Sequence, residues 1–160
     1  MTKNILIPID FCVASLNTLK LVLESNETQD IFANLIYSEY SSDSEMDLLF
    51  YSPSKIINKN LTGEFKEALE ILKNRYSSLK HVAIKLFHGN NLNYLENFLS
   101  ANKIQEIYLP KTYQLKLVNR AFNSISLLKK APLVVNEIDW EQHLNTTEQE
   151  HLTALFNKSL

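Results

Sequence analysis

The chain has 160 residues, and 16 Lys and Arg against 18 Asp and Glu leave a formal charge of -2 at pH 7. That length suits one domain, and the balanced charge offers no broad positive surface for nucleic acid or an anionic membrane. A single cysteine, Cys12, excludes an internal disulfide framework and a thiolate-rich zinc site. Residues 1–3 start no basic-then-apolar leader and no apolar run approaches the roughly 20 residues that cross a bilayer, so we expect a cytoplasmic protein.

Apolar runs in the first third of the chain predict two strands and one helix. A strand is expected over residues 4–10, because NILIPID is too short for a helix and is polar on neither side. Helical spacing predicts a helix over about residues 13–24, and IFANLIYS predicts a second buried strand at 31–38. Residues 39–60 fit neither pattern, and a connection this long often carries function or covers something. This connection contains a group of apolar residues, which either folds onto the edge of the domain or contacts a partner. The group comprises Met46, Leu48, Leu49, Phe50 and Tyr51.

Two further helices and a strand are expected in the middle of the chain. An amphipathic helix is predicted over about residues 61–76, with Thr62 as its N-cap. A third strand at 82–88 leads through Gly89 into another helix. The inner face of that helix carries Leu92, Leu95, Leu99 and Phe98.

The last elements complete a sheet and leave an appended segment. Strands are predicted at 104–109 and 133–138, with a core helix between them over about residues 117–129. Strands that alternate with helices predict a parallel sheet with right-handed crossovers and helices on both faces. We therefore assign residues 1–138 to one domain and residues 139–160 to a helical extension.

The extension is predicted to be an amphipathic helix. Thr147 and Glu150 have the spacing of a capping box, which marks the start of a helix. An apolar stripe follows, which must bury itself on its own domain or on a partner. It consists of Leu152, Leu155, Phe156 and Leu160.

The sequence lacks the motifs of the catalytic and phosphate-binding sites that are common on parallel sheets. A response-regulator receiver needs a phosphoacceptor Asp after the third strand, where this chain has Phe87, His88 and Gly89. Neither CxxC nor GxxxxGK[ST] nor a Gly-x-Ser-x-Gly elbow is present, and the four histidines lack metal-ligand spacing. We therefore expect no catalytic residues and no metal site.

Three segments together resemble the universal stress protein family. They are NILIPIDFCVASLNTLKLVL at residues 4–23, the turn His88-Gly89-Asn90, and APLVV at residues 131–135. Their order and spacing match the family over about residues 3–138. The resemblance implies an α/β fold with a five-stranded, parallel, doubly wound sheet, Rossmann-like and similar to the adenine nucleotide alpha-hydrolases, with the C-terminal helix as an extra.

The phosphate-binding motif of the family is altered here. Nucleotide-binding members carry Gly-x2-Gly-x9-Gly-Ser/Thr after the fourth strand, and its bare backbone approaches the phosphates. This spacing places Pro110, Tyr113 and Asn123 at the three glycines, and Ser124 at the Ser/Thr position. Pro110 lacks an N–H to donate, and Tyr113 adds a ring where backbone should face phosphate. The resemblance therefore predicts a degenerate phosphate site.

The nucleoside end of the site is better preserved. By resemblance, Asp10 lies near the adenosine part of the ligand, with Pro8 and Ile9 beside it and Ser38 near the adenine. Asp10 could bind a ribose hydroxyl, or it could accept backbone N–H bonds where the first helix starts. Lys111, Lys116 and Arg120 could replace the missing backbone donors, or could form an ordinary solvated face. The candidate nucleotide site comprises Pro8, Ile9, Asp10, Ser38, Gly89, Lys111, Arg120, Asn123 and Ser124.

Three functions remain open from the sequence. The first is a non-enzymatic stress-response or regulatory module that has lost tight ATP binding and has no cofactor. The second is a binder of ATP or another adenine nucleotide with an altered phosphate cradle and, at most, slow ATP hydrolysis. The third is a scaffold that binds a protein partner through residues 46–51 and the C-terminal helix. The family resemblance also implies a homodimer through the last strand, with Leu133, Val135 and Ile138 at the interface.

Overall fold

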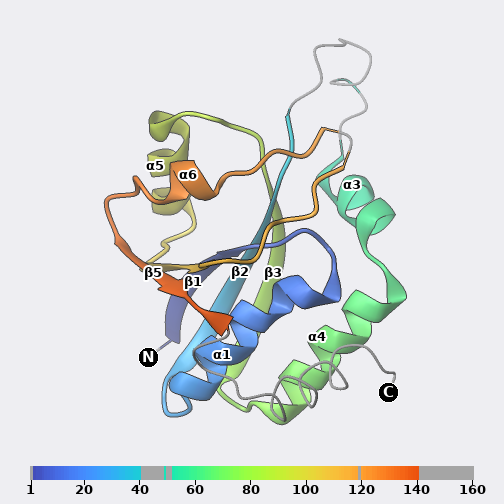
Figure 1. Cartoon of the computed structure of the whole chain (residues 1–160), viewed down its shortest axis with the longest axis vertical. Coiled ribbons are helices and arrows are strands. Elements are labelled where there is room, and N and C mark those ends of the chain that lie inside the picture. Colours follow the sequence, from blue (N-terminus) through green and yellow to red (C-terminus); the bar gives the residue numbers. More distant parts are fainter. Residues whose placement is uncertain (1, 41–48, 50–51, 119, 141–160) are drawn as a thin grey trace.

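The computed structural model describes residues 2–40, 49, 52–118 and 120–140, which form an α/β domain around one sheet (Figure 1). In these residues five strands are all parallel, in the order β3-β2-β1-β4-β5. The predicted fold class is therefore confirmed. The strands are β1 (Thr2–Pro8), β2 (Asp30–Ser38), β3 (Leu79–Phe87), β4 (Glu106–Pro110) and β5 (Val134–Ile138).

The strand order reverses between β1 and β4. From β1 the chain moves outward to β2 and β3, then returns to the other side of β1 for β4 and β5. Pro8 is the last residue of β1, where a missing N–H does least harm to the sheet. In doubly wound sheets a ligand crevice lies outside the carboxyl ends of the strands at this reversal. That point carries Asp10 after β1 and residues 111–113 after β4.

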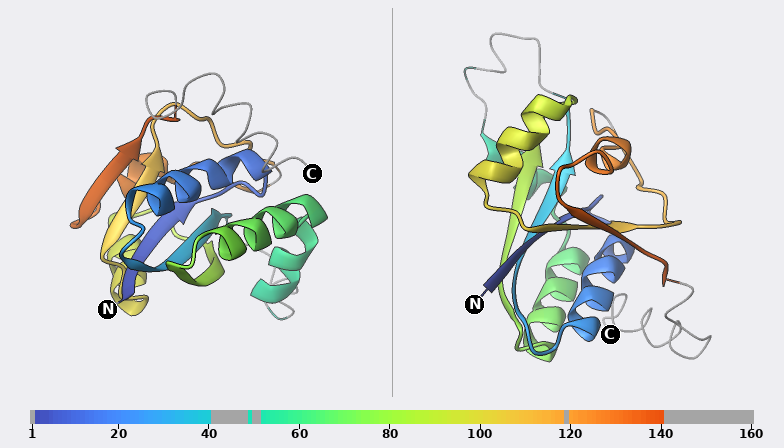
Figure 2. Two further views of the ribbon diagram at one scale, coloured as in Figure 1. Left: turned by 90° about the horizontal axis from the view of Figure 1, so that it is seen from below. Right: turned by 90° about the vertical axis from the view of Figure 1, so that its left-hand side faces the viewer.

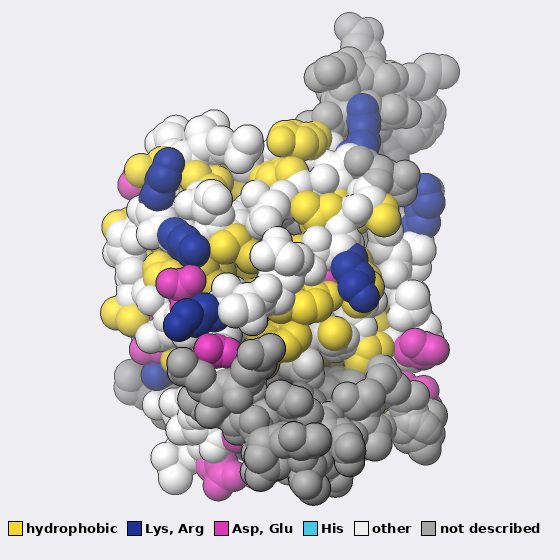
Figure 3. All heavy atoms as spheres, in the orientation of Figure 1, with side chains coloured by type: hydrophobic (Ala, Val, Ile, Leu, Met, Phe, Trp, Pro, Cys, Tyr) yellow, Lys and Arg dark blue, Asp and Glu magenta, His cyan; other side chains and the backbone are white. Residues whose placement is uncertain are grey.

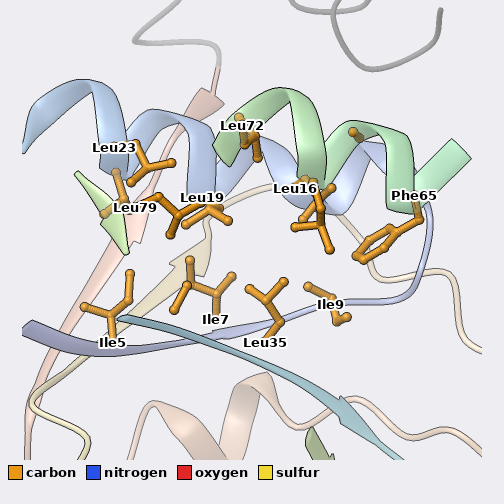
Figure 4. Close-up of a cluster of buried hydrophobic side chains, with 14 of the residues drawn as sticks. Ile5, Ile7, Ile9, Leu16, Leu19, Leu23, Leu35, Phe65, Leu72 and Leu79 are labelled. Atoms are coloured by element: carbon orange, nitrogen blue, oxygen red, sulfur yellow. The ribbon is translucent and has the colours of Figure 1, made fainter. Parts of the chain in front are cut away.

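One face of the sheet is covered by described helices from the first half of the chain. A 3-10 turn η1 (Val13–Leu16) leads into α1 (Asn17–Ser25), and α3 (Pro53–Asn60) precedes α4 (Gly63–Arg75). Figure 4 shows the apolar core between these helices and β1 and β2. Thr62 caps α4 as predicted, because its Oγ1 accepts a hydrogen bond of 3.1 Å from the N–H of Phe65. Fully buried residues of this core include Ile7, Leu19, Leu35, Phe65 and Leu72.

The opposite face is covered by α5 (Leu92–Ala101) and the short α6 (Ile125–Leu128). Figure 2 shows the two layers of helices with the sheet between them. Phe87 lies at the centre of this second core and makes edge contacts with the rings of Tyr94 and Phe98. Helices on both faces agree with the sequence-based prediction.

The helix predicted over residues 117–129 is wrong for its first half. Of the described residues in this range, only Ile125–Leu128 are helical, and Ala121 pairs with Glu39 after the end of β2 instead. The Phe122 N–H donates to the carbonyl of Ser38, and the Tyr40 N–H donates to that of Arg120, both at 2.9 Å. These long-range backbone bonds override the helical spacing of the apolar side chains.

The long connection at residues 39–60 contains a helix that the pattern analysis missed. Ser52 caps α3 with its Oγ, and Pro53 occupies the first helical position. Of the apolar group predicted in this connection, Leu49 is 79% exposed. The other members, Met46, Leu48, Phe50 and Tyr51, lie outside the described residues, as does the extension from residue 141.

The described surface has no broad basic patch on the face that Figure 3 shows, where Lys and Arg side chains are scattered among polar and apolar ones. This arrangement agrees with the balanced charge of the chain. Among the described helices, none combines the length and the hydropathy that a membrane span requires.

Candidate functional site

Asp10 lies at the strand-order reversal, and its carboxylate is used by the chain itself. The residue is 6% exposed. Its Oδ1 accepts a hydrogen bond of 2.9 Å from the Cys12 N–H, two residues on. Its Oδ2 accepts a bond of 2.6 Å from the Tyr113 hydroxyl and one of 2.8 Å from the Lys116 N–H. Phe11, with φ of 65°, turns the chain sharply between β1 and η1 and so brings Cys12 back to Asp10.

Tyr113 is held over Asp10 from two sides. Its ring stacks on Trp140, with ring centroids 4.7 Å apart and an interplanar angle of 26°. The Trp140 indole N–H in turn donates to the Thr18 hydroxyl of α1 at 3.1 Å. Burial first, and then the hydrogen bond to Asp10, raises the pKa of the Tyr113 hydroxyl, so it stays protonated and keeps donating. We call Tyr113 with Trp140 the aromatic plug.

The thiol of Cys12 faces the same carboxylate. Burial raises its pKa, and the charge of Asp10 raises it further. A thiol with a raised pKa is mostly protonated near neutral pH and is a weak nucleophile. This environment favours Cys12 as a small structural residue at the start of η1.

Two serines of the candidate site, one at the end of β2 and one before α6, are buried. Ser38 is 5% exposed and Ser124 is 1% exposed. Neither hydroxyl oxygen has a hydrogen-bond partner among the described residues. Asn123 accepts a bond of 2.9 Å from the Ile125 N–H, so Asn123, and not Ser124, provides the side-chain bond at the start of α6.

The other residues of the candidate site lie apart from one another. Ile9 contributes its side chain to the core, and its N–H donates to the Ile36 carbonyl at 2.9 Å (Figure 4). The Lys111 N–H donates to the carbonyl of Ile138 on β5 at 2.9 Å, and the Lys111 side chain is exposed. Arg120 lines a separate pocket beside α3. The structure therefore gathers Asp10, Tyr113 and Lys116, whereas Lys111 and Arg120 serve other contacts.

Gly89 is covered by a side chain of its own domain. A Cβ at this position would lie 2.0 Å from Cγ of Tyr94, which packs directly on the glycine. The Tyr94 hydroxyl also accepts a bond of 3.3 Å from the His88 N–H. Close packing of an aromatic ring therefore explains the glycine without a ligand.

We expect Gly89→Ala to lower the free energy of unfolding by about 1–3 kcal/mol, because an overpacked site must shift its neighbours. Gly63→Ala is the matched control, since nothing lies within 4 Å of a Cβ there and Gly63 is in the first turn of α4. That substitution should be neutral or stabilise the protein by up to about 1 kcal/mol. Urea unfolding of both variants measures the difference, and equal stabilities would contradict the packing of Tyr94 on Gly89.

Among the described residues, no group of three or more His, Cys, Asp or Glu is arranged to hold a metal ion. The sequence-based expectation that the protein has no metal site stays a prediction.

Comparison with known proteins finds likeness at the level of structure alone. No family model matches the sequence, and no curated protein matches it. The universal stress protein UspA from Lactobacillus plantarum superimposes with a TM-score of 0.55 at 15% identity, over 85% of this chain and 97% of that one. A universal stress protein from Archaeoglobus fulgidus gives a TM-score of 0.50 at 12% identity, over 86% and 93% of the two chains. The chain therefore has the fold of the universal stress proteins.

Proposed function

We propose that this protein is a cytoplasmic, non-enzymatic regulatory module of the universal stress protein type that does not bind ATP tightly. The proposal rests on the hydrogen bonds that the Asp10 carboxylate already accepts from its own chain. Its two carboxylate oxygens already accept three hydrogen bonds from Cys12, Tyr113 and Lys116. A nucleoside that needed Asp10 would have to displace bonds that the folded chain makes for itself.

The energetic consequence for a nucleotide is large. A hydrogen bond to a charged group contributes about 1.5–3 kcal/mol net, so displacing the two bonds from Tyr113 and Lys116 costs about 3–6 kcal/mol. Each 1.4 kcal/mol weakens binding about tenfold, which places the loss at about a hundredfold or more. Pro110 ends β4 without an N–H, and the next N–H, that of Lys111, is bonded to Ile138. The phosphate end therefore offers little to compensate.

Calorimetry with ATP, ADP, AMP and adenosine tests the proposal. We expect no heat of binding for any of the four at micromolar protein and ligand concentrations. Micromolar ATP binding that weakens in Lys111→Ala or Arg120→Ala would overturn the proposal in favour of an altered phosphate cradle. Slow release of inorganic phosphate from ATP by the pure protein, abolished by the same substitutions, would favour the cradle in the same way.

The nucleotide-binding alternative has one observation in its favour. The hydroxyls of Ser38 and Ser124 are buried without a partner among the described residues, and such groups usually find a ligand, a water or a neighbour. The Ser38 carbonyl, in contrast, already accepts a hydrogen bond from the Phe122 N–H. Because of these two hydroxyls, nucleotide binding is the second candidate function. The scaffold alternative rests on segments that lie outside the described residues, apart from Leu49.

We further propose that the protein is a homodimer through β5. In the described part of the chain β5 pairs with β4 on one side only, and Val134 is 59% exposed. An edge strand has unpaired N–H and C=O groups that can bind another strand, and β5 of a second copy is the simplest partner. Leu133, Val135 and Ile138 would lie along this interface. Sedimentation should show a dimer at micromolar concentration, and a monomer would contradict the proposal.

A further inference from the structure

We propose that a pocket at the carboxyl end of β2 binds a small molecule through an oxyanion, either a carboxylate or a phosphate group. The pocket has a volume of about 270 Å³ and lies between β2, α3 and the segment that follows β4. In Figure 1 this segment passes close to α3. The proposal is independent of the occupation of Asp10. The lining residues are Tyr37, Glu39, Ile56, Lys59, Asn60 and Arg120.

Tyr37 supplies a hydrogen-bond donor at the pocket. The residue is 2% exposed and lines the pocket. Its ring is fixed by contact with Phe11, with centroids 4.8 Å apart. Burial first, and then the charges of Glu39 and Asp10, raises the pKa of the hydroxyl, which therefore remains a donor at neutral pH. Because Tyr37 lines the pocket, a ligand there can accept a hydrogen bond from this hydroxyl.

The charged side chains that line the pocket favour an anion. Lys59 and Arg120 flank the pocket with Glu39, and none of the three forms an ion pair within 4 Å with any other residue that the structure describes. The pocket therefore holds one net positive charge. A guanidinium offers a planar pair of donors that fits two oxygens of a carboxylate or phosphate, and an ammonium adds a point charge. Glu39 can accept from a hydroxyl or amine on the same ligand.

The backbone that carries these side chains is hydrogen-bonded without a ligand. The Arg120 carbonyl accepts from the Tyr40 N–H, and Ala121 forms a bridge with Glu39. The last turn of α3 is closed by Asn60, whose Nδ2 donates to the Ile56 carbonyl at 2.8 Å. A backbone that is fixed before binding spends little free energy on ordering, so the cost falls on the exposed side chains of Lys59 and Arg120. Its volume is slightly below the range of about 300–1,000 Å³ that accommodates drug-sized ligands, which indicates a compact molecule.

NMR titration of the full chain tests the proposal, with inorganic phosphate and malonate as probes and sodium chloride at matched ionic strength as the reference. We expect saturable shifts of the backbone amides of Glu39, Asn60 and Arg120 with at least one probe. Affinity should fall about tenfold or more in Arg120→Ala and in Lys59→Ala, and several-fold in Tyr37→Phe. Lys55→Ala is the matched control, because Lys55 is exposed on the same helix and does not line the pocket.

The comparison of the two probes identifies whether the group is a carboxylate or a phosphate. Shifts no larger than those with sodium chloride would overturn the proposal. Affinities that are unchanged in Arg120→Ala or Tyr37→Phe, in variants that melt near the wild-type temperature, would overturn it as well. Calorimetry with ATP reports on the Asp10 site through Lys111→Ala, because Lys111 does not line the pocket, so either proposal can fail while the other stands.

Discussion

Asp10→Ala is expected to lower the free energy of unfolding by about 3–5 kcal/mol, because it removes the acceptor of three hydrogen bonds at once. The Cys12 N–H, the Lys116 N–H and the Tyr113 hydroxyl all donate to this carboxylate. Each buried donor left without a partner costs about 1–3 kcal/mol, and partial access of water to the rim reduces the sum. Urea denaturation followed by circular dichroism measures the loss.

Asp30→Ala is the control for removing a carboxylate. Asp30 lies at the start of β2, and its side chain is 46% exposed. Its Oδ1 lies 4.0 Å from Nζ of Lys80. An exposed pair of this kind contributes little, so we expect a change within about 0.5 kcal/mol. If Asp10→Ala were as mild as Asp30→Ala, the carboxylate would not hold the three donors, and the proposed loss of tight nucleotide binding would lose its support.

The sequence predicted the sheet well because each strand is defined by its own residues. NILIPID and IFANLIYS are short apolar runs whose period and length leave little alternative, and Thr62 carries a local cap. The same local reasoning failed for residues 117–124. There the apolar spacing fits a helix, but backbone bonds to the end of β2 and a turn between Val118 and Ala121 replace the helical bonds. Those bonds join residues far apart in the sequence, and no local pattern reports them.

Contacts between residues far apart in the sequence also limited what could be predicted of the candidate site. The sequence revealed that Tyr113 stands where the family has a glycine, and so predicted a poor phosphate site. It did not reveal that the Tyr113 hydroxyl reaches Asp10 across 103 positions, nor that Trp140 stacks on the ring. The pocket beside α3 was missed because the helix itself was missed. The Ser-Pro pair at residues 52 and 53 was the available signal, since it is a common start of a helix.

Removing the aromatic plug should change nucleotide affinity more than any other single substitution at this site. Tyr113→Gly deletes the ring, frees one oxygen of Asp10 and restores the residue type that the family has at this position. We expect adenosine and AMP to bind this variant about 10–100-fold more tightly than the wild type, the equivalent of one displaced charged hydrogen bond. Calorimetry at millimolar ligand measures both proteins on one scale.

Two variants separate the hydroxyl from the ring. Tyr113→Phe removes the bond to Asp10 but keeps the stack on Trp140, so the site should stay closed and affinity should rise little. Trp140→Ala removes the stack and the bond to Thr18 but keeps the hydroxyl on Asp10. An intermediate gain is expected, because Tyr113 can then move away more easily. If Tyr113→Gly folds and still binds adenosine no better than the wild type, the ring is not what closes the site. The missing N–H of Pro110 and the backbone hydrogen bond from Phe122 to Ser38 would then be the features that weaken nucleotide binding.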